Sequence, residues 1–313
     1  MTEHTTDLAR QLLDTWAAQG RDGFLLSDPQ TAEIATREAA DDICGIGFRF
    51  RWMPHRELRG DIAKLEARGI LNPNRDQSRL FRDPRDPHGR HCFLCERNIA
   101  ECHPMEVLVP LTLAGREYFA GANFAWIEPD HYTVMPAEHT DQTYSRHVLD
   151  AMCGLHSQSG GRFRVLFNGT GAGATIPWHL HFQITTAEMP IERIRPGSES
   201  HYPTAVRVFP FDDAGREQAH AAAEEWLRGG KEHRSINIFV TTTDGTSRIF
   251  VFPRDQRRAT AEGKGLVGGF EVAGDFVLSA PNERATFENA SAKTARDILG
   301  QVRPPEWPGN GGP

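Results

Sequence analysis

The spacing of apolar residues separates helix-like from strand-like regions along the chain. Near the N-terminus, leucines and a tryptophan recur at helical intervals, and we expect residues 1 to about 40 to be mainly helical. A second helical pattern covers about 54–69. The segment that follows, 72–91, is rich in Asn, Asp, Arg and Pro, which is typical of a long loop or arm.

The centre of the chain has the apolar runs of β-strands. This region combines several strands with one helix, which favours an α+β fold, an antiparallel sheet with packed helices, over a doubly wound α/β fold. We expect strands at 105–113, 122–129 and 131–137, a helix at 139–160, and strands at 162–169 and 178–186.

A second group of strands follows a helix expected at about 214–228. These strands are expected at 235–245, 246–255 and 269–279, with a turn at TDGT (243–246). Two successive strand-rich halves indicate an internal duplication. We therefore divide the chain into a helical N-terminal region with the arm (1–85), a core (86–200), a second strand-rich half (201–300) and a Pro/Gly-rich tail expected to be disordered (301–313).

Composition and charge narrow the classes of protein. The 313 residues contain no apolar run of membrane-spanning length, and the N-terminus has no signal-like pattern, so we expect a cytoplasmic protein without a membrane partner. The net charge of -7 argues against general binding to nucleic acid. It leaves room for a local basic pocket that binds a phosphorylated small molecule.

Cys92 and Cys95 form a C-x-x-C pair in a chain with five cysteines, which is a poor disulfide framework. The pair fits a zinc site, a redox pair or two buried small residues. The redox interpretation needs a thioredoxin-like βαβ unit, which the pattern does not show. A structural zinc needs two more ligands. The candidates further along the chain are His131, His179 and His181, with Cys102 and His103 as a nearer alternative.

A glycine-rich loop, Asn168–Thr175, directly precedes alternating polar residues. Such a loop lets backbone N–H groups approach phosphate oxygens. A dinucleotide-binding fingerprint would need a helix next, but Pro177 and a strand-like pattern follow. In a strand, His179, His181 and Gln183 would project from one face, where one histidine could bind metal while its neighbour attacks phosphorus.

These motifs together resemble the transferase branch of the histidine triad superfamily. CFLCERN (92–98), PDHYTVMPAEHTDQ (129–142) and FNGTGAGATIPWHLHFQ (167–183) are similar to this H-x-H-x-Q branch. It includes galactose-1-phosphate uridylyltransferase, diadenosine tetraphosphate phosphorylase and the GDP-hexose phosphorylases. The resemblance covers about residues 90–195, is weaker over 235–280, and implies a histidine-triad-like core.

The resemblance also implies roles for individual residues. The implied metal ligands are Cys92, Cys95, His131 and His179. The implied nucleophile is His181, and Gln183 would bind the α-phosphate oxygens. The implied phosphate-cradling residues are Asn168, Gly171, Gly173 and Thr175.

Leu180 separates the two histidines where the uridylyltransferases have proline, which favours the phosphorylases. The resemblance thus implies a nucleotidyltransferase of the phosphorylase type, acting on an NDP-sugar or dinucleoside polyphosphate through a nucleotidyl-histidine intermediate. Inorganic phosphate or a sugar phosphate would accept the nucleotide. A structural zinc, or iron, and a homodimer are further implications. The alternatives are a nucleotide hydrolase of the same superfamily and a non-catalytic protein that binds zinc and a nucleotide.

Overall fold

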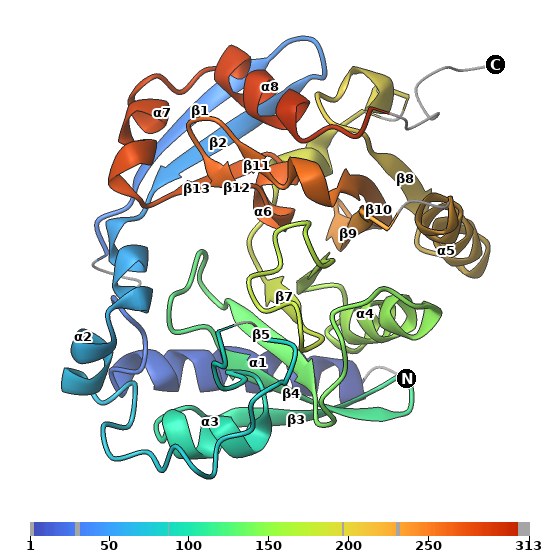
Figure 1. Cartoon of the computed structure of the whole chain (residues 1–313). Coiled ribbons are helices and arrows are strands. Elements are labelled where there is room, and N and C mark those ends of the chain that lie inside the picture. The colour runs from blue at the N-terminus through green and yellow to red at the C-terminus, as the bar shows by residue number, and fades with distance from the viewer. Residues whose placement is uncertain (1–2, 29–31, 87, 196, 230–231, 306–313) are drawn as a thin grey trace.

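The computed structural model describes residues 3–28, 32–86, 88–195, 197–229 and 232–305. Its main feature is a sheet of eight strands in which all neighbours are antiparallel (Figure 1). This confirms the α+β prediction. In order across the sheet, the strands are β3 (Leu108–Leu113), β4 (Arg116–Ala122), β5 (Tyr132–Pro136), β7 (Phe182–Thr185), β6 (Arg164–Asn168), β9 (Arg234–Thr243), β10 (Thr246–Asp255) and β8 (Arg207–Pro210).

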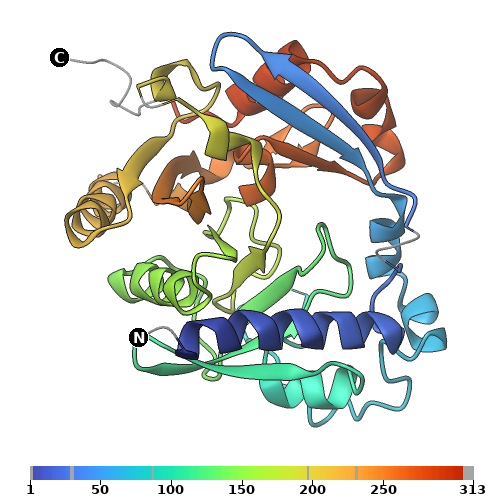
Figure 2. The ribbon, with the colours of Figure 1, turned by 180° about the vertical axis from the view of Figure 1, so that it is seen from behind.

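Three helices cover one face of this sheet: α1 (Glu3–Arg21), α4 (Arg146–Gln158) and α5 (Asp213–Arg228). Figure 2 shows α1 lying across β3 and β4. The hydroxyl of Tyr132 on β5 donates to the Leu12 carbonyl of α1 at 2.5 Å. Because side chains alternate along a strand, Thr133 points to the opposite face. That second face carries the site described below.

A smaller sheet contains β1 (Ala35–Asp41), β2 (Ile46–Trp52) and β13 (Asp275–Leu278). Helix α1 ends at Arg21 and β1 begins at Ala35, so the expectation of helix up to about residue 40 is wrong from Asp22 onward. Phe48 and Phe50 alternate with exposed or charged residues along β2, stack with β13 and are fully buried, which is the pattern of a strand that buries one face.

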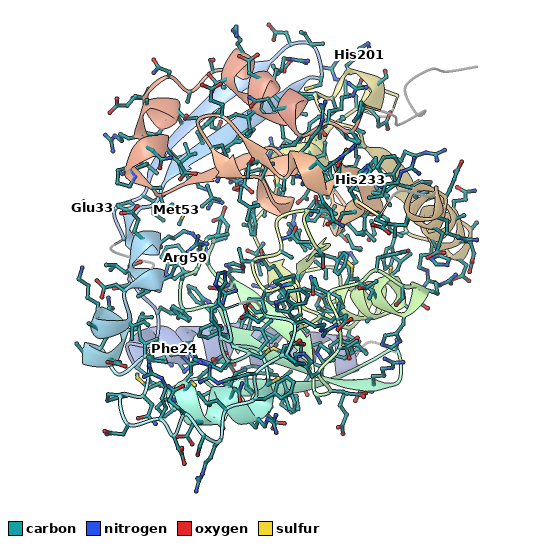
Figure 3. All side chains as sticks on the ribbon, in the orientation of Figure 1. Phe24, Glu33, Met53, Arg59, His201 and His233 are labelled. Atoms are coloured by element: carbon teal, nitrogen blue, oxygen red, sulfur yellow. The ribbon has the colours of Figure 1, made fainter. Side chains whose placement is uncertain are left out.

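Short elements join the two sheets and close the fold. Residues 54–67 are largely helical, as expected, and Arg59 of this segment is labelled in Figure 3. The remaining helices and strands are η1 (Pro54–Gly60), α2 (Ile62–Ala67), α3 (Glu96–Cys102), η2 (Pro190–Arg193), η3 (Glu199–His201), η4 (Gln256–Arg258), β11 (Thr260–Ala261), β12 (Gly265–Leu266), α6 (Gly269–Val272), η5 (Pro281–Glu283), α7 (Arg284–Glu288) and α8 (Ala292–Gln301).

The two expected halves share one sheet, because β6 pairs with β9. The N- and C-terminal regions also meet, because β13 pairs in parallel with β2. The tail expected to be disordered begins at the end of α8, and its residues 306–313 lie outside the described residues. Within the described chain, no helix is long and apolar enough to cross a membrane.

Candidate active site and metal centre

Four side chains meet beside the end of β5 and form a Cys2His2 cluster. The members, whose ligand atoms all lie within 4.8 Å of one another, are Cys92, Cys95, His139 and His179. The Cys92 Sγ is 3.2 Å from the His179 Nδ1, and the Cys95 Sγ is 3.2 Å from the His139 Nδ1. In a tetrahedral zinc site, neighbouring ligand atoms are about 3.4–3.8 Å apart. The cluster therefore fits a four-coordinate metal ion.

The other ring nitrogen of each histidine has its own acceptor. The His139 Nε2 donates to Asp83 at 2.9 Å, and the His179 Nε2 donates to the Pro136 carbonyl at 3.4 Å. These bonds orient both rings and leave each Nδ1 lone pair for a metal, as second-layer partners do in metal sites. Arg85 also pairs with Asp83 and holds the pKa of that carboxyl well below its usual range.

One of the two thiols is already in the state that binds metal, whereas the hydrogen bond to Cys92 and burial raise the pKa of Cys95, whose proton would leave when a metal binds. The neighbouring Cys95 and His179 lower the pKa of Cys92 to about 4, so its sulfur is a thiolate at neutral pH. Both cysteines are buried, which shields the cluster from solvent. The arrangement is closed by four protein ligands and so fits a structural metal rather than one with an open catalytic position.

His131 is not part of this cluster, and its assignment as a metal ligand is corrected to His139. The two histidines flank the five-residue strand β5, whose rise of about 3.3 Å per residue places them at its opposite ends. His131 is fully buried at the other end, where its Nδ1 accepts from the Ile127 backbone at 3.1 Å and its ring meets Phe270 edge-on.

His181 is held by main-chain bonds just before β7, which begins at Phe182, four residues later than the expected strand. Its Nδ1 donates to the His179 carbonyl at 2.9 Å, which leaves Nε2 with a free lone pair. Burial lowers the pKa of His181 to about 4, so the ring is neutral at pH 7. A neutral imidazole with an unprotonated Nε2 can act as a nucleophile.

Gln142 fixes the backbone of His181. Its Oε1 accepts from the His181 N–H at 2.7 Å, and its Nε2 donates to the His181 carbonyl at 3.1 Å and to the Asn168 carbonyl at 2.6 Å. Gln142 is buried, and one side chain thus ties the histidine segment to the start of the glycine loop. The sequence interpretation did not single out this residue.

The glycine loop packs directly on a second glycine pair, Gly268–Gly269. Gly173 has a φ of +100°, and a Cβ there would overlap Gly268, so only glycine allows this approach. Gly171 has a φ of +69°. Below the loop, the Asn168 side chain accepts from Asn237 at 2.7 Å, and this buried pair fixes the end of β6.

A cavity of about 580 Å³ lies between the second face of the main sheet and the segments around α6 and β13. Among the predicted site residues, the cavity is lined by Asn168, Gly173, Thr175 and Gln183. It is not lined by Gly171 or His181. Among the described residues, no hydrogen bond engages the Gln183 amide, so it is available to a ligand. Arg56 and Arg59 also line the cavity, and their positive charge can offset phosphate charge.

Three residues of the site were missed from the sequence: Asp83, His139 and Gln142. All three lie in segments that the sequence interpretation marked, the arm 72–91 and the motif 129–142. His139 and Gln142 follow β5 directly, within the quoted motif. For Asp83 the only signal was its place in the charged arm, because the local sequence does not show which carboxylate of the arm contacts His139.

Comparisons with known proteins match the fold over the whole chain. A family model described as a domain of unknown function, DUF4922, matches residues 53–186. Among solved structures, yeast Ap4A phosphorylase Apa2 in complex with AMP matches with a TM-score of 0.62 and 15% identity, covering 99% of both chains. The same yeast enzyme in complex with Ap4A gives a TM-score of 0.59 and 14% identity, covering 97% of this chain and 98% of the other. The search of curated proteins found no match.

Proposed function

We propose that this protein is a nucleotidyltransferase of the phosphorylase type that acts on a dinucleoside polyphosphate. The observation that carries the proposal is the division of roles within the H-x-H-x-Q residues. His179 belongs to the metal cluster, His181 keeps Nε2 free, and Gln183 faces the cavity. The full-length likeness in fold to Ap4A phosphorylase supports this substrate class over an NDP-sugar.

The reaction would proceed in two displacements. The Nε2 lone pair of His181 attacks the α-phosphorus, the P–O bond to the remaining polyphosphate breaks, and with Ap4A a nucleoside triphosphate leaves. An oxygen of inorganic phosphate then attacks the same phosphorus, the P–N bond breaks, and a nucleoside diphosphate departs with His181 restored. Gln183 and the loop amides would donate to the phosphoryl oxygens as charge shifts between them.

The metal ion would have a structural role. Cys92, Cys95, His139 and His179 would hold it, and zinc is the ion that best suits two thiolates and two imidazoles, with iron as an alternative. When bound, the ion would lock the arm segment around Asp83 and the strand end at His179 into one unit. His181 is two residues from this anchor. The homodimer and the cytoplasmic location remain predictions.

The test is nucleotide release from Ap4A and a panel of NDP-sugars, with and without phosphate, followed by chromatography. We expect ADP and ATP from Ap4A only when phosphate is present, and no turnover by His181→Ala, which should keep its metal. Release of AMP and ATP without phosphate would identify a hydrolase. No turnover of any panel member, and no nucleotide adduct of His181 by intact mass, would refute the proposal.

A further inference from the structure

Glu106 places a carboxyl group in the cavity, where no donor from the described residues reaches it. Its Oε1 lies over Gly121 of β4, where a Cβ atom would overlap it, so glycine at this position makes room for the carboxyl. Glu106 is half-buried, and an unpaired carboxyl group in such a place is stabilised when a ligand completes its hydrogen bonds.

Aromatic side chains surround this end of the cavity. The Glu106 N–H donates to the His103 carbonyl at 2.9 Å, so the two residues share one turn. The ring of His103 stacks on Phe124, with their centroids 5.8 Å apart, and both residues line the cavity. Phe93, from the C-x-x-C segment, adds an exposed ring to the lining. Flat apolar surfaces beside a hydrogen-bonding group are the usual surroundings of a bound nucleobase.

The register of the sheet sets the distance from this carboxyl to the reaction centre. Gly121 is paired with Thr133, and Thr133 is paired with Gln183, so the three residues form one row across β4, β5 and β7. Two strand spacings separate Gly121 from Gln183, or about 10 Å. A nucleoside bridges a gap of this size, with its phosphate at Gln183 and its base at Glu106.

The protonation state of Glu106 adds chemical detail. Burial raises the pKa of Glu106 to about 8, because no cation among the described residues favours its charged form. At neutral pH the carboxyl therefore carries one O–H donor and one carbonyl acceptor, side by side.

We propose that Glu106 binds the nucleobase of the substrate through hydrogen bonds. Adenine presents a ring nitrogen acceptor, N1, next to an amino donor, N6, which is the complement of a neutral carboxyl. Guanine presents the O6 acceptor next to the N1–H donor, so the same carboxyl can pair with either purine. The inference rests on the proposed function for the placement of the phosphate, and it adds the residue that holds the base.

The test uses the full-length protein, with calorimetric binding of AMP and turnover of Ap4A in phosphate. Glu106→Leu removes both hydrogen bonds and should weaken AMP binding by about 10-fold to 100-fold. Glu106→Gln keeps one donor and one acceptor and should bind AMP within about threefold of the wild-type affinity. Gly121→Ala displaces the carboxyl and should resemble Glu106→Leu. Glu117→Gln, the same change at an exposed position of β4, is the control and should leave AMP binding unchanged.

The outcomes separate this inference from the proposed reaction. AMP binding by Glu106→Leu at wild-type strength, or a Glu106→Gln variant that binds AMP as weakly as Glu106→Leu, would overturn it. Turnover of Ap4A by Glu106→Leu with the wild-type kcat and KM would leave the reaction standing alone. AMP binding that depends on Glu106, in a protein that transfers no nucleotide, would support the base assignment and refute the reaction.

Discussion

Replacing Gln142 with leucine tests whether one buried amide holds in place the segment of His181, the proposed nucleophile. In the structure, the Gln142 side chain makes three hydrogen bonds, two to the backbone of His181 and one to the Asn168 carbonyl. Leucine has a similar volume, so Gln142→Leu removes these bonds without opening a large cavity. Its effect should therefore come mainly from the polar groups left behind.

The size of the effect follows from the groups that lose their partners. Among the described residues, Gln142 is the hydrogen-bond partner of both the His181 N–H and the His181 carbonyl, and neither group has another. Each buried and unsatisfied group costs about 1–3 kcal/mol, so the two together cost about 2–6 kcal/mol. A domain is stable by about 5–15 kcal/mol in total, so the variant should fold but with much reduced stability.

Urea unfolding, followed by tryptophan fluorescence, measures this loss as a change in the free energy of unfolding. Gln158→Leu is the matched control, because its amide makes a single exposed bond to the Thr112 carbonyl and should cost less than about 1 kcal/mol. We also expect Gln142→Leu to lower kcat more than it raises KM, since the nucleophile loses its position. A loss below about 1 kcal/mol, equal to the control, would refute the account of Gln142 as the support of His181.

Three further predictions concern the metal, a buried ion pair and acid stability. Asp83→Asn should weaken metal binding by about 10-fold to 100-fold in competition with a chromophoric chelator, whereas His131→Asn should leave it unchanged; the reverse result would restore His131 as a ligand. Asp275→Asn removes the bidentate carboxylate of the buried Arg51, which keeps its ion pair with Glu128 at 2.9 Å, and should cost about 1–3 kcal/mol in urea unfolding. A cost near zero would mean that solvent reaches the pair. Burial holds the pKa of His131 well below 6.5. Below pH 6.5 the unfolded chain therefore binds a proton that the folded chain does not, and the free energy of unfolding decreases as the pH is lowered. Between pH 6 and 5, His131→Asn should reduce the slope of the unfolding free energy against pH by about 1.4 kcal/mol per pH unit, measured by urea unfolding at each pH. An unchanged slope would place the proton uptake at another residue.

The metal site shows how far the sequence could be interpreted. The C-x-x-C pair and the first histidine of H-x-H were predicted from motifs, and the structure brings them together. The fourth member of the cluster is His139, whereas the resemblance implied His131, at the opposite end of β5. Which end meets the C-x-x-C segment is set by how β5 pairs with β4 and β7, and the local sequence does not contain that information.

The strands were predicted where apolar runs were long and uninterrupted, as in β9 and β10. The expected strand 122–129 was misplaced, because the chain turns at Ala114–Gly115, both with positive φ, and β4 ends at Ala122. In β2, two arginines interrupt the apolar residues. Arg51 pairs with Asp275, far along the chain, so its place in a buried strand depends on a partner that local pattern does not reveal.

The cavity explains why the motifs alone give a reaction but not a substrate. The part of its lining proposed to bind phosphate is the glycine loop and Gln183, which lie within one stretch of sequence. The rest of the lining includes Arg56, Glu106 and Phe270, which come from three distant segments. Changes in those segments can alter the base or the leaving group while the H-x-H-x-Q residues stay the same. We therefore expect substrate specificity in this fold to follow the sheet-to-sheet contacts rather than the nucleophile motif.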